Sequence, residues 1–131
     1  MSTDQPQDSE AELVRRAELV RIILLDVDGV LTDGSIMLGG DDLEVKRFNV
    51  QDGQGIVLAR EAGLKIGIIT GRKSAAVEQR ANELRLDVVC QGSVNKMESL
   101  QAILDQFDLS AEQVSYIGDD WTDLSVMQSV G

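Results

Sequence analysis

The chain has 131 residues, a length that suits one domain, because two separate cores of half that size would be difficult to stabilise. Its 12 Lys and Arg residues against 23 Asp and Glu residues leave a net charge of -11, which argues against nucleic acid or an anionic membrane as a partner. A single cysteine, Cys90, excludes an internal disulfide, and the lack of histidine excludes a Ser-His-Asp triad and histidine metal ligands.

The first 20 residues comprise a polar segment and a predicted helix. Residues 1–10 are polar and acidic, which predicts a disordered lead-in that is unlike a signal peptide. No apolar run is long enough to span a bilayer, so we expect a cytoplasmic protein. Residues 11–20 place Leu13, Ala17 and Val20 on one stripe and predict a short helix.

A buried strand and a hairpin are predicted next. Residues 22–25 are apolar on both faces, which is typical of a central strand in a parallel sheet. Residues 35–48 form two short strand patterns around a Gly-Gly-Asp-Asp turn, and this predicts a β-hairpin.

From residue 52 onward, helix and strand patterns alternate. We predict helices at 52–62, 74–84, 96–107 and 121–130, and strands at 65–70, 86–90 and 114–117. Such alternation favours an α/β fold with a doubly wound, Rossmann-like parallel sheet and helices on both faces. Residues 11–131 are then one domain, with no linker and no second domain.

Polar residues stand where each predicted strand ends. Ligands of such sheets bind beyond the carboxyl ends of the strands, so these residues are candidates for a common site. They are Asp26 and Asp28, then Thr70, Gly71 and Arg72, then Lys96, and finally Asp119, Asp120 and Asp123.

The acidic residues in this set predict a bound cation. Two carboxylates about 4 Å apart repel by about 4 kcal/mol at an effective dielectric constant of 20. Asp26, Asp28, Asp119 and Asp120 therefore cannot share a site unless they are protonated or bind a cation. Oxygen ligands without histidine favour Mg²⁺.

The remaining residues favour a phosphoryl group as ligand. Thr70, the backbone N–H of Gly71 and the ammonium of Lys96 can hold phosphate oxygens. A carboxylate can accept a phosphoryl group as a nucleophile, and a second carboxyl group two residues on can protonate the leaving oxygen and then activate water.

Four sequence segments carry a resemblance to a known superfamily. LLDVDGVLTDG, IITGR, the lysine of QGSVNK and GDDWTD look like the motifs of the haloacid dehalogenase (HAD) superfamily of phosphohydrolases. Within it, DVDGVLTDG, FNVQDGQGI, TGRKS and YIGDD resemble the 3-deoxy-D-manno-octulosonate 8-phosphate phosphatases. The resemblance implies strand order 3-2-1-4, hydrolysis of a small sugar phosphate through an aspartyl-phosphate with Mg²⁺, and a role in lipopolysaccharide precursor synthesis.

The resemblance also implies roles for particular residues. Asp26 becomes the nucleophile and a metal ligand, Asp28 the general acid and base with its carbonyl on the metal, and Asp119 the remaining metal ligand. Asp120 and Asp123 would lie just behind these ligands. Thr70, Gly71 and Lys96 would bind the phosphoryl group, and the substrate contacts would fall on Asn49, Val50, Gln51, Asp52, Gly53, Arg72 and Arg80.

Most of these residues also have an ordinary structural interpretation. Lys96 could simply begin a helix, and Asp120 and Asp123 could cap the last one. Residues 49, 51 and 52 could be turn residues, and Arg72 and Arg80 could share a solvated helix face.

The chain departs from the family pattern in three respects. Gln51 stands where the family often has arginine, and Val57 where it often has a basic residue, which leaves a related acidic-sugar (nonulosonate) phosphatase as an alternative. Relatives continue beyond the position of Gly131 through another strand, so we expect a C-terminally truncated domain that lacks the fifth strand of the sheet.

The spacing of the motifs leaves no room for a cap domain. Only the hairpin and one helix fit between Asp28 and Thr70, and only a helix and a strand between Gly71 and Lys96. We therefore expect the apolar hairpin 35–48 to pack against other subunits, in a homotetramer as the resemblance implies.

Two rival functions remain at this point. A phospho-accepting receiver domain also combines acidic residues, threonine and lysine, but it holds the acceptor aspartate on a middle strand. A catalytically inactive oligomerising or interaction module is the other possibility.

Overall fold

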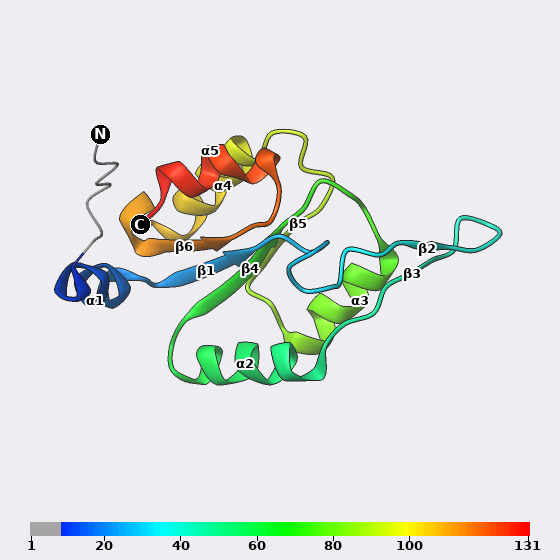
Figure 1. Ribbon diagram of the computed structural model, residues 1–131, viewed down its shortest axis with the longest axis horizontal. Helices are drawn as coiled ribbons and strands as arrows, with labels where there is room; N and C mark the ends of the chain where they lie inside the picture. The colour runs from blue at the N-terminus through cyan, green and yellow to red at the C-terminus, as the bar shows by residue number, and fades with distance from the viewer. Residues whose placement is uncertain (1–8) are drawn as a thin grey trace, which may run out of the picture.

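The fold is a parallel β-sheet with helices on both of its faces (Figure 1). The computed structural model describes residues 9–131, so most of the lead-in predicted for residues 1–10 lies outside the described residues. Helix α1 (Glu10–Leu19) begins one residue before the predicted boundary, because the Ser9 side chain accepts a hydrogen bond from the Glu12 N–H at 3.2 Å and caps it. Within the described range, no helix is both long and apolar enough to cross a membrane.

The four parallel strands lie in the order β5, β4, β1, β6. Their bounds are β1 (Ile22–Leu25), β4 (Lys65–Ile69), β5 (Val88–Cys90) and β6 (Val114–Ile117). β1 is central and pairs with both β4 and β6, so that Leu25 lies opposite Ile68 and Ile117. The predicted fold class and strand order are confirmed. Because the strands are parallel, the segments that follow β1, β4, β5 and β6 lie at one edge of the sheet.

The helices agree with prediction except at some ends. They are α2 (Val50–Glu61), α3 (Ala75–Leu84), α4 (Lys96–Phe107) and α5 (Leu124–Ser129), with short 3-10 turns η1 (Ala111–Gln113) and η2 (Trp121–Asp123). α2 begins two residues earlier than predicted, because the Asn49 side chain accepts hydrogen bonds from the N–H groups of Gln51 and Asp52. The helix predicted for 121–130 is divided into η2 and α5.

Two hydrophobic cores hold the helices to the two faces of the sheet (Figure 1). Alternate residues of β1 serve the two cores, since successive strand side chains point to opposite faces. The core beneath α4 and α5 contains Ile22, Leu24, Ile69, Leu100, Ile103, Val114, Tyr116 and Val126. The core beneath α2 and α3 contains Leu25, Val27, Leu31, Ile56, Ile66, Ile68 and Val77.

A two-stranded hairpin projects from the carboxyl-end side of the sheet (Figure 1). It consists of β2 (Met37–Leu38) and β3 (Glu44–Val45), and its turn places Asp41 and Asp42 at positive φ. Its apolar side chains are exposed, and Leu38 is 75% exposed. In residues 9–131 the segment between β1 and α2 holds only this hairpin and no cap domain, in agreement with the prediction.

Candidate active site

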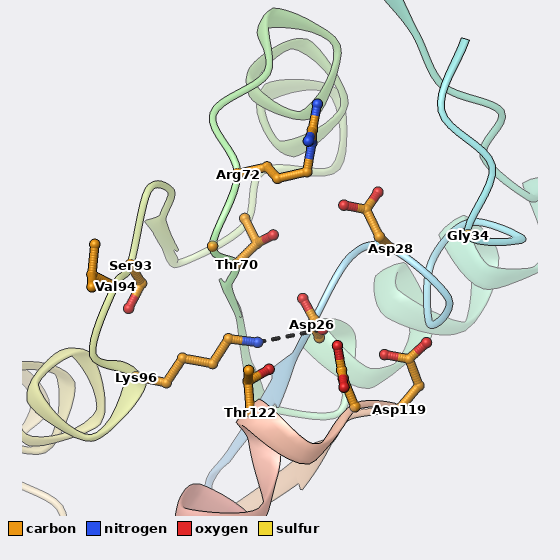
Figure 2. A pocket seen from close by; sticks show the side chains of 12 residues that line it. Asp26, Asp28, Gly34, Thr70, Arg72, Ser93, Val94, Lys96, Asp119 and Thr122 are labelled. Carbon is orange, nitrogen blue, oxygen red and sulfur yellow. Dashed lines mark ion pairs between the residues drawn. The ribbon is translucent and has the colours of Figure 1, made fainter.

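The segments that follow the four parallel strands surround one open cavity of about 400 Å³ (Figure 2). Each of these segments contributes side chains to the wall, because the strands are parallel and end at the same edge. The cavity is lined by Asp26, Asp28, Gly34, Thr70, Gly71, Arg72, Ser93, Val94, Lys96, Asp119, Asp120 and Thr122. Eight of the predicted site residues are thus brought together.

Asp26 is the first residue after β1 and is only 7% exposed. Its N–H donates to the carbonyl of Ile117 at 3.0 Å, which extends the β1–β6 pairing by one residue and fixes where the side chain leaves the sheet. Its Oδ1 accepts a hydrogen bond from the N–H of Val27 at 2.7 Å. Burial raises the pKa of Asp26 above its ordinary value, although the Val27 N–H and the Lys96 ammonium act against this. An oriented carboxylate of this kind is suited to act as a nucleophile.

Lys96 is the first residue of α4, and its buried ammonium lies between two carboxylates. The Nζ atom is 3.4 Å from Oδ2 of Asp26 and donates to Oδ1 of Asp123 at 2.6 Å. Asn95 caps α4 by accepting hydrogen bonds from the N–H groups of Met97 and Glu98, so the start of the helix is fixed. Lys96 is therefore aimed into the cavity rather than toward solvent (Figure 2).

Asp123 is completely buried and accepts four hydrogen bonds. Besides Lys96, the Tyr116 hydroxyl donates to Oδ1 at 2.6 Å, and the N–H groups of Asp119 and Asp120 donate to Oδ2 at 3.2 Å. Burial alone would raise the pKa of Asp123, but the hydrogen bonds from Lys96 and Tyr116 hold it below its ordinary value. Asp123 thus orients the segment that carries Asp119.

Three carboxylates lie close enough to hold a metal ion. Single oxygens of Asp26, Asp119 and Asp123 lie within 4.8 Å of one another. Asp123 is fully buried and does not line the cavity, whereas Asp26 and Asp119 do, so these two are the carboxylates that could hold a cation there. Gly29, at φ +83°, makes room for them, since a Cβ at that position would overlap the Asp119 carboxylate. This oxygen-only donor set fits Mg²⁺.

Thr70 and Gly71 form the opposite wall of the cavity. The Thr70 N–H donates to the carbonyl of Cys90 at 2.9 Å, and the Thr70 carbonyl accepts from the N–H of Ser93 at 3.0 Å. These bonds continue the β4–β5 pairing and leave the hydroxyl of Thr70 on the cavity side (Figure 2). Arg72 stands at the rim with a half-exposed side chain.

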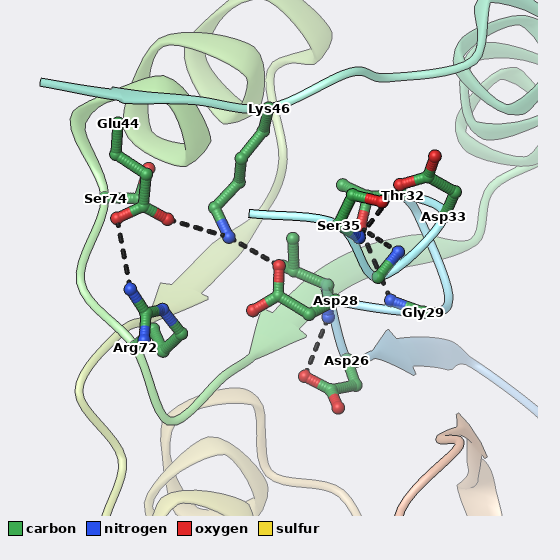
Figure 3. Close-up of polar contacts among 12 residues, drawn as sticks. Asp26, Asp28, Gly29, Thr32, Asp33, Ser35, Glu44, Lys46, Arg72 and Ser74 are labelled. Atoms are coloured by element: carbon green, nitrogen blue, oxygen red, sulfur yellow. Dashed lines mark hydrogen bonds and ion pairs between the residues drawn. The ribbon is translucent and has the colours of Figure 1, made fainter. Parts of the chain in front are cut away.

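Asp28 points away from the three clustered carboxylates and toward the hairpin (Figures 2 and 3). There it forms an ion pair with Lys46, a residue just after β3 whose side chain is 1% exposed. Lys46 also lies 3.1 Å from Oε1 of Glu44, and Oε2 of Glu44 lies 3.5 Å from Arg72. The Lys46 ammonium holds the pKa of Glu44 below its ordinary value.

Six of the predicted substrate-binding residues lie outside this cavity. Asn49 and Asp52 line a smaller groove at the base of the hairpin, Gln51 lines an apolar groove beside β1 and β6, and Val50, Gly53 and Arg80 line one between α2 and α3. Arg80 lies over the ring of Phe48 and donates to the carbonyl of Asn49 at 3.5 Å. Their role in substrate binding stays a prediction.

Sequence reasoning missed Lys46, Glu44 and Tyr116. One signal for the hairpin pair was present, since Glu44 and Lys46 are two residues apart in a strand-like segment and so share a face. Nothing in the local sequence pairs Lys46 with Asp28, because that contact depends on the path of the hairpin. Tyr116 was part of a predicted strand, but its bond to Asp123 depends on how η2 packs.

Comparisons with known proteins agree with the family resemblance of the sequence motifs, although no family model matches the chain. The 3-deoxy-D-manno-octulosonate 8-phosphate phosphatase of Escherichia coli K12 is 42% identical over 121 residues, which are 92% of this chain and 64% of that protein. This chain thus spans less than two thirds of the length of that relative.

Two solved structures extend the comparison. The phosphatase of that name from Moraxella catarrhalis, in complex with magnesium, phosphate and KDO, is 35% identical, with a TM-score of 0.89 and coverage of 93% of this chain and 70% of that one. A HAD superfamily (subfamily III A) hydrolase from Legionella pneumophila is 36% identical, with a TM-score of 0.88 and coverage of 92% and 66%. The chain therefore belongs to the HAD superfamily and, within it, to the family of 3-deoxy-D-manno-octulosonate 8-phosphate phosphatases.

Proposed function

We propose that this chain carries the active site of a Mg²⁺-dependent phosphatase that hydrolyses 3-deoxy-D-manno-octulosonate 8-phosphate. The observation that carries the proposal is that Asp26, Thr70, Lys96 and Asp119, which come from separate segments, line one cavity. The M. catarrhalis relative, whose structure contains magnesium, phosphate and KDO, supports the metal and the substrate.

Mg²⁺ would be held by the carboxylates of Asp26 and Asp119 and by the backbone carbonyl of Asp28. When bound, it would neutralise charge on the phosphoryl oxygens and so favour attack by an anion. Asp123 and Asp120 would support this arrangement from behind, Asp123 through its bonds to two backbone N–H groups and Asp120 through its bond to the N–H of Trp121.

The reaction would then have two steps on this chain's own residues. A carboxylate oxygen of Asp26 attacks phosphorus, the bond from phosphorus to the sugar oxygen breaks, and Asp28 gives its proton to that oxygen. Asp28 next takes a proton from water, which attacks phosphorus and releases phosphate from Asp26. Thr70, Gly71 and Lys96 hold the phosphoryl oxygens throughout.

Phosphate release from two substrates tests the proposal. The sugar phosphate and 4-nitrophenyl phosphate are each assayed with Mg²⁺ or with EDTA, using the natural chain, Asp26→Asn and Asp105→Asn. Asp105 is an exposed acid on α4, so its substitution is a matched control. We expect metal-dependent turnover that Asp26→Asn abolishes and Asp105→Asn leaves unchanged. Absence of turnover in the natural chain would favour an inactive interaction module.

Gln51 and Val57 affect which substrate we expect. Both stand where the family often has a cation, and a sugar acid has a carboxylate to be matched. A related nonulosonate phosphate is therefore the alternative substrate. A higher kcat/KM for a nonulosonate 9-phosphate than for the octulosonate 8-phosphate would establish it.

We further infer that the hairpin 35–48 mediates a homotetramer, so that a neighbouring copy covers the open cavity. The exposed apolar side chains of Ile36, Met37, Leu38, Leu43 and Val45 support this. Sedimentation of Leu38→Asp should show smaller species than the natural chain, whereas Leu13→Asp on α1 should not. A monomeric natural chain with full turnover would contradict the inference.

The remaining features of the proposal follow from this activity. Residues 11–131 would act as one hydrolase domain with the hairpin as its flap. The reaction would take place in the cytoplasm and contribute a precursor for lipopolysaccharide.

A further inference from the structure

Lys46 is a buried cation that the reaction steps above do not use. Its side chain is 1% exposed, and it lies between the carboxylates of Asp28 and Glu44 (Figure 3). Removing an ammonium group from water is costly unless the group is paired, so these two contacts account for its burial. Lys46 stays buried at the base of an otherwise exposed hairpin.

The contacts of Lys46 join three segments that are far apart in the sequence. Asp28 follows β1, Glu44 and Lys46 belong to the hairpin, and Arg72 follows β4. Charges alternate along the series Asp28, Lys46, Glu44 and Arg72, and each neighbouring pair is an ion pair. The hairpin is thereby tied to two walls of the cavity.

The contact also selects one oxygen of Asp28. Lys46 donates to Oδ1, an oxygen that can accept this hydrogen bond whether or not Oδ2 carries a proton, and Oδ2 stays available for proton transfer. Asp28 does not belong to the group of Asp26, Asp119 and Asp123, whose oxygens lie within 4.8 Å of one another. A carboxylate without this partner would be free to turn toward a cation bound by Asp26 and Asp119.

We propose that Lys46 is a positioning residue that holds the Asp28 carboxyl group where it can protonate the leaving oxygen. The proposal rests on the function proposed above, in which Asp28 is the general acid. In this scheme Lys46 contacts neither the phosphoryl group nor the metal-binding carboxylates of Asp26 and Asp119, and it acts through the Asp28 side chain alone.

The dependence of kcat/KM on the leaving group distinguishes a positioning role from a merely structural one. In the first step the bond to the leaving oxygen breaks, and kcat/KM reports this step. An alkyl oxygen needs a proton to leave, whereas 4-nitrophenolate leaves without one. Loss of a positioned general acid therefore lowers kcat/KM for the sugar phosphate much more than for the aryl phosphate.

The test compares Lys46→Met and Lys46→Arg with the natural chain. The control is Lys65→Met, which removes the same charge from an exposed lysine at the start of β4. We expect Lys46→Met to lower kcat/KM by about 100-fold for the sugar phosphate and by less than about tenfold for the aryl phosphate. Lys46→Arg should restore most of the loss, and Lys65→Met should cause none. Equal losses for both substrates, or no loss for either, would overturn the proposal.

Crystal structures separate this proposal from the proposed function. In Lys46→Met, the Asp28 side chain should leave the position it has in the natural chain, while the sheet and Asp26 stay in place. An unmoved Asp28 carboxyl group would overturn the positioning role even if the natural chain is active. An inactive natural chain with a displaced Asp28 in the variant would reject the proposed function and leave the positioning supported.

Discussion

The ammonium of Lys96 and the carboxylate of Asp123 form an ion pair of 2.6 Å, and both side chains are buried. The same carboxylate accepts hydrogen bonds from Tyr116 on β6 and from two backbone N–H groups before η2. Asp123 therefore connects α4, β6 and η2, and it fixes Lys96 and Asp119 relative to each other. Removing one partner of such an ion pair is destabilising, because the other charge would stay buried without a partner. The pair therefore keeps both side chains in fixed positions.

Tyr116→Phe tests this connection without removing a charge. The variant loses one hydrogen bond to a charged acceptor, so we expect the free energy of unfolding to fall by about 1.5–3 kcal/mol. Urea unfolding of both proteins measures the change. Ser129→Ala is the control, since it removes an exposed hydrogen bond to Ser125 on α5 and should cost less than about 1 kcal/mol. Equal losses in the two variants would contradict the role of Asp123 as a connection.

Asp26→Asn should stabilise the protein when no metal is present. Burial raises the pKa of Asp26 above its ordinary value of 3.8, so the folded state holds a proton that the unfolded state has lost. Stability is therefore lost as the pH rises from about 3.8 through the pKa of the folded state. In EDTA at pH 7, Asp26→Asn should have a higher free energy of unfolding than the natural chain.

Thermal melts of the variant and the natural chain measure this difference in stability. Melts under other conditions give the controls for Asp26→Asn. The advantage of the variant should shrink as the pH is lowered toward the ordinary pKa of aspartate. Excess Mg²⁺ should raise the melting temperature of the natural chain and leave that of the variant unchanged. A less stable variant in EDTA at pH 7 would mean that the Val27 and Lys96 contacts outweigh burial.

Gly29→Ala should disrupt metal binding more than it disrupts folding. Its methyl group would overlap the carboxylate of Asp119, in addition to the cost of φ +83°. Gly63→Ala is a matched control, because Gly63 has φ +97° and open space at the Cβ position. Both variants should lose about 1–2 kcal/mol of stability. Calorimetric titration should show at least tenfold weaker Mg²⁺ binding in Gly29→Ala only, and unchanged binding would place the metal away from Asp119.

The carboxyl group of Glu12 on α1 should titrate at an unusually low pH. Hydrogen bonds from Arg15 and then Arg16 lower the pKa of Glu12 to about 2. Because this pKa is below the ordinary value of 4.5, the contribution of Glu12 to folding is complete above pH 4.5 and is lost as the pH falls through about 2. The carbon shift of the carboxyl group, followed by NMR, measures the value directly, and Arg15→Gln should return it toward 4.5.

The sheet could be predicted because its strands carry strong local signals. The run at residues 22–25 is apolar on both faces, and the helix 96–107 was predicted with the bounds that α4 has. Once strand and helix alternate, each helix returns the chain to the start of the next strand, so the strands are parallel and all their carboxyl ends lie at one edge. The gathering of Asp26, Thr70, Lys96 and Asp119 follows from that topology.

Contacts that depend on the path of a loop could not be predicted. Asp28 and Lys46 meet because the hairpin turns back over the end of β1, and no periodicity encodes that direction. The Asn49 side chain caps α2, so it points to its own helix and not into the cavity. The burial of Asp123 likewise depends on the packing of η2 against Tyr116.

The central position of β1 has a consequence for how the chain folds. Ile22 pairs with Lys65 on one side and with Val114 on the other, so the second partner is synthesised long after the first. Until then, one edge of β1 and its apolar side chains lack their native neighbours. Pairings between such distant residues slow folding and expose intermediates to aggregation. Newly made chains should therefore be most vulnerable just before β6 emerges from the ribosome.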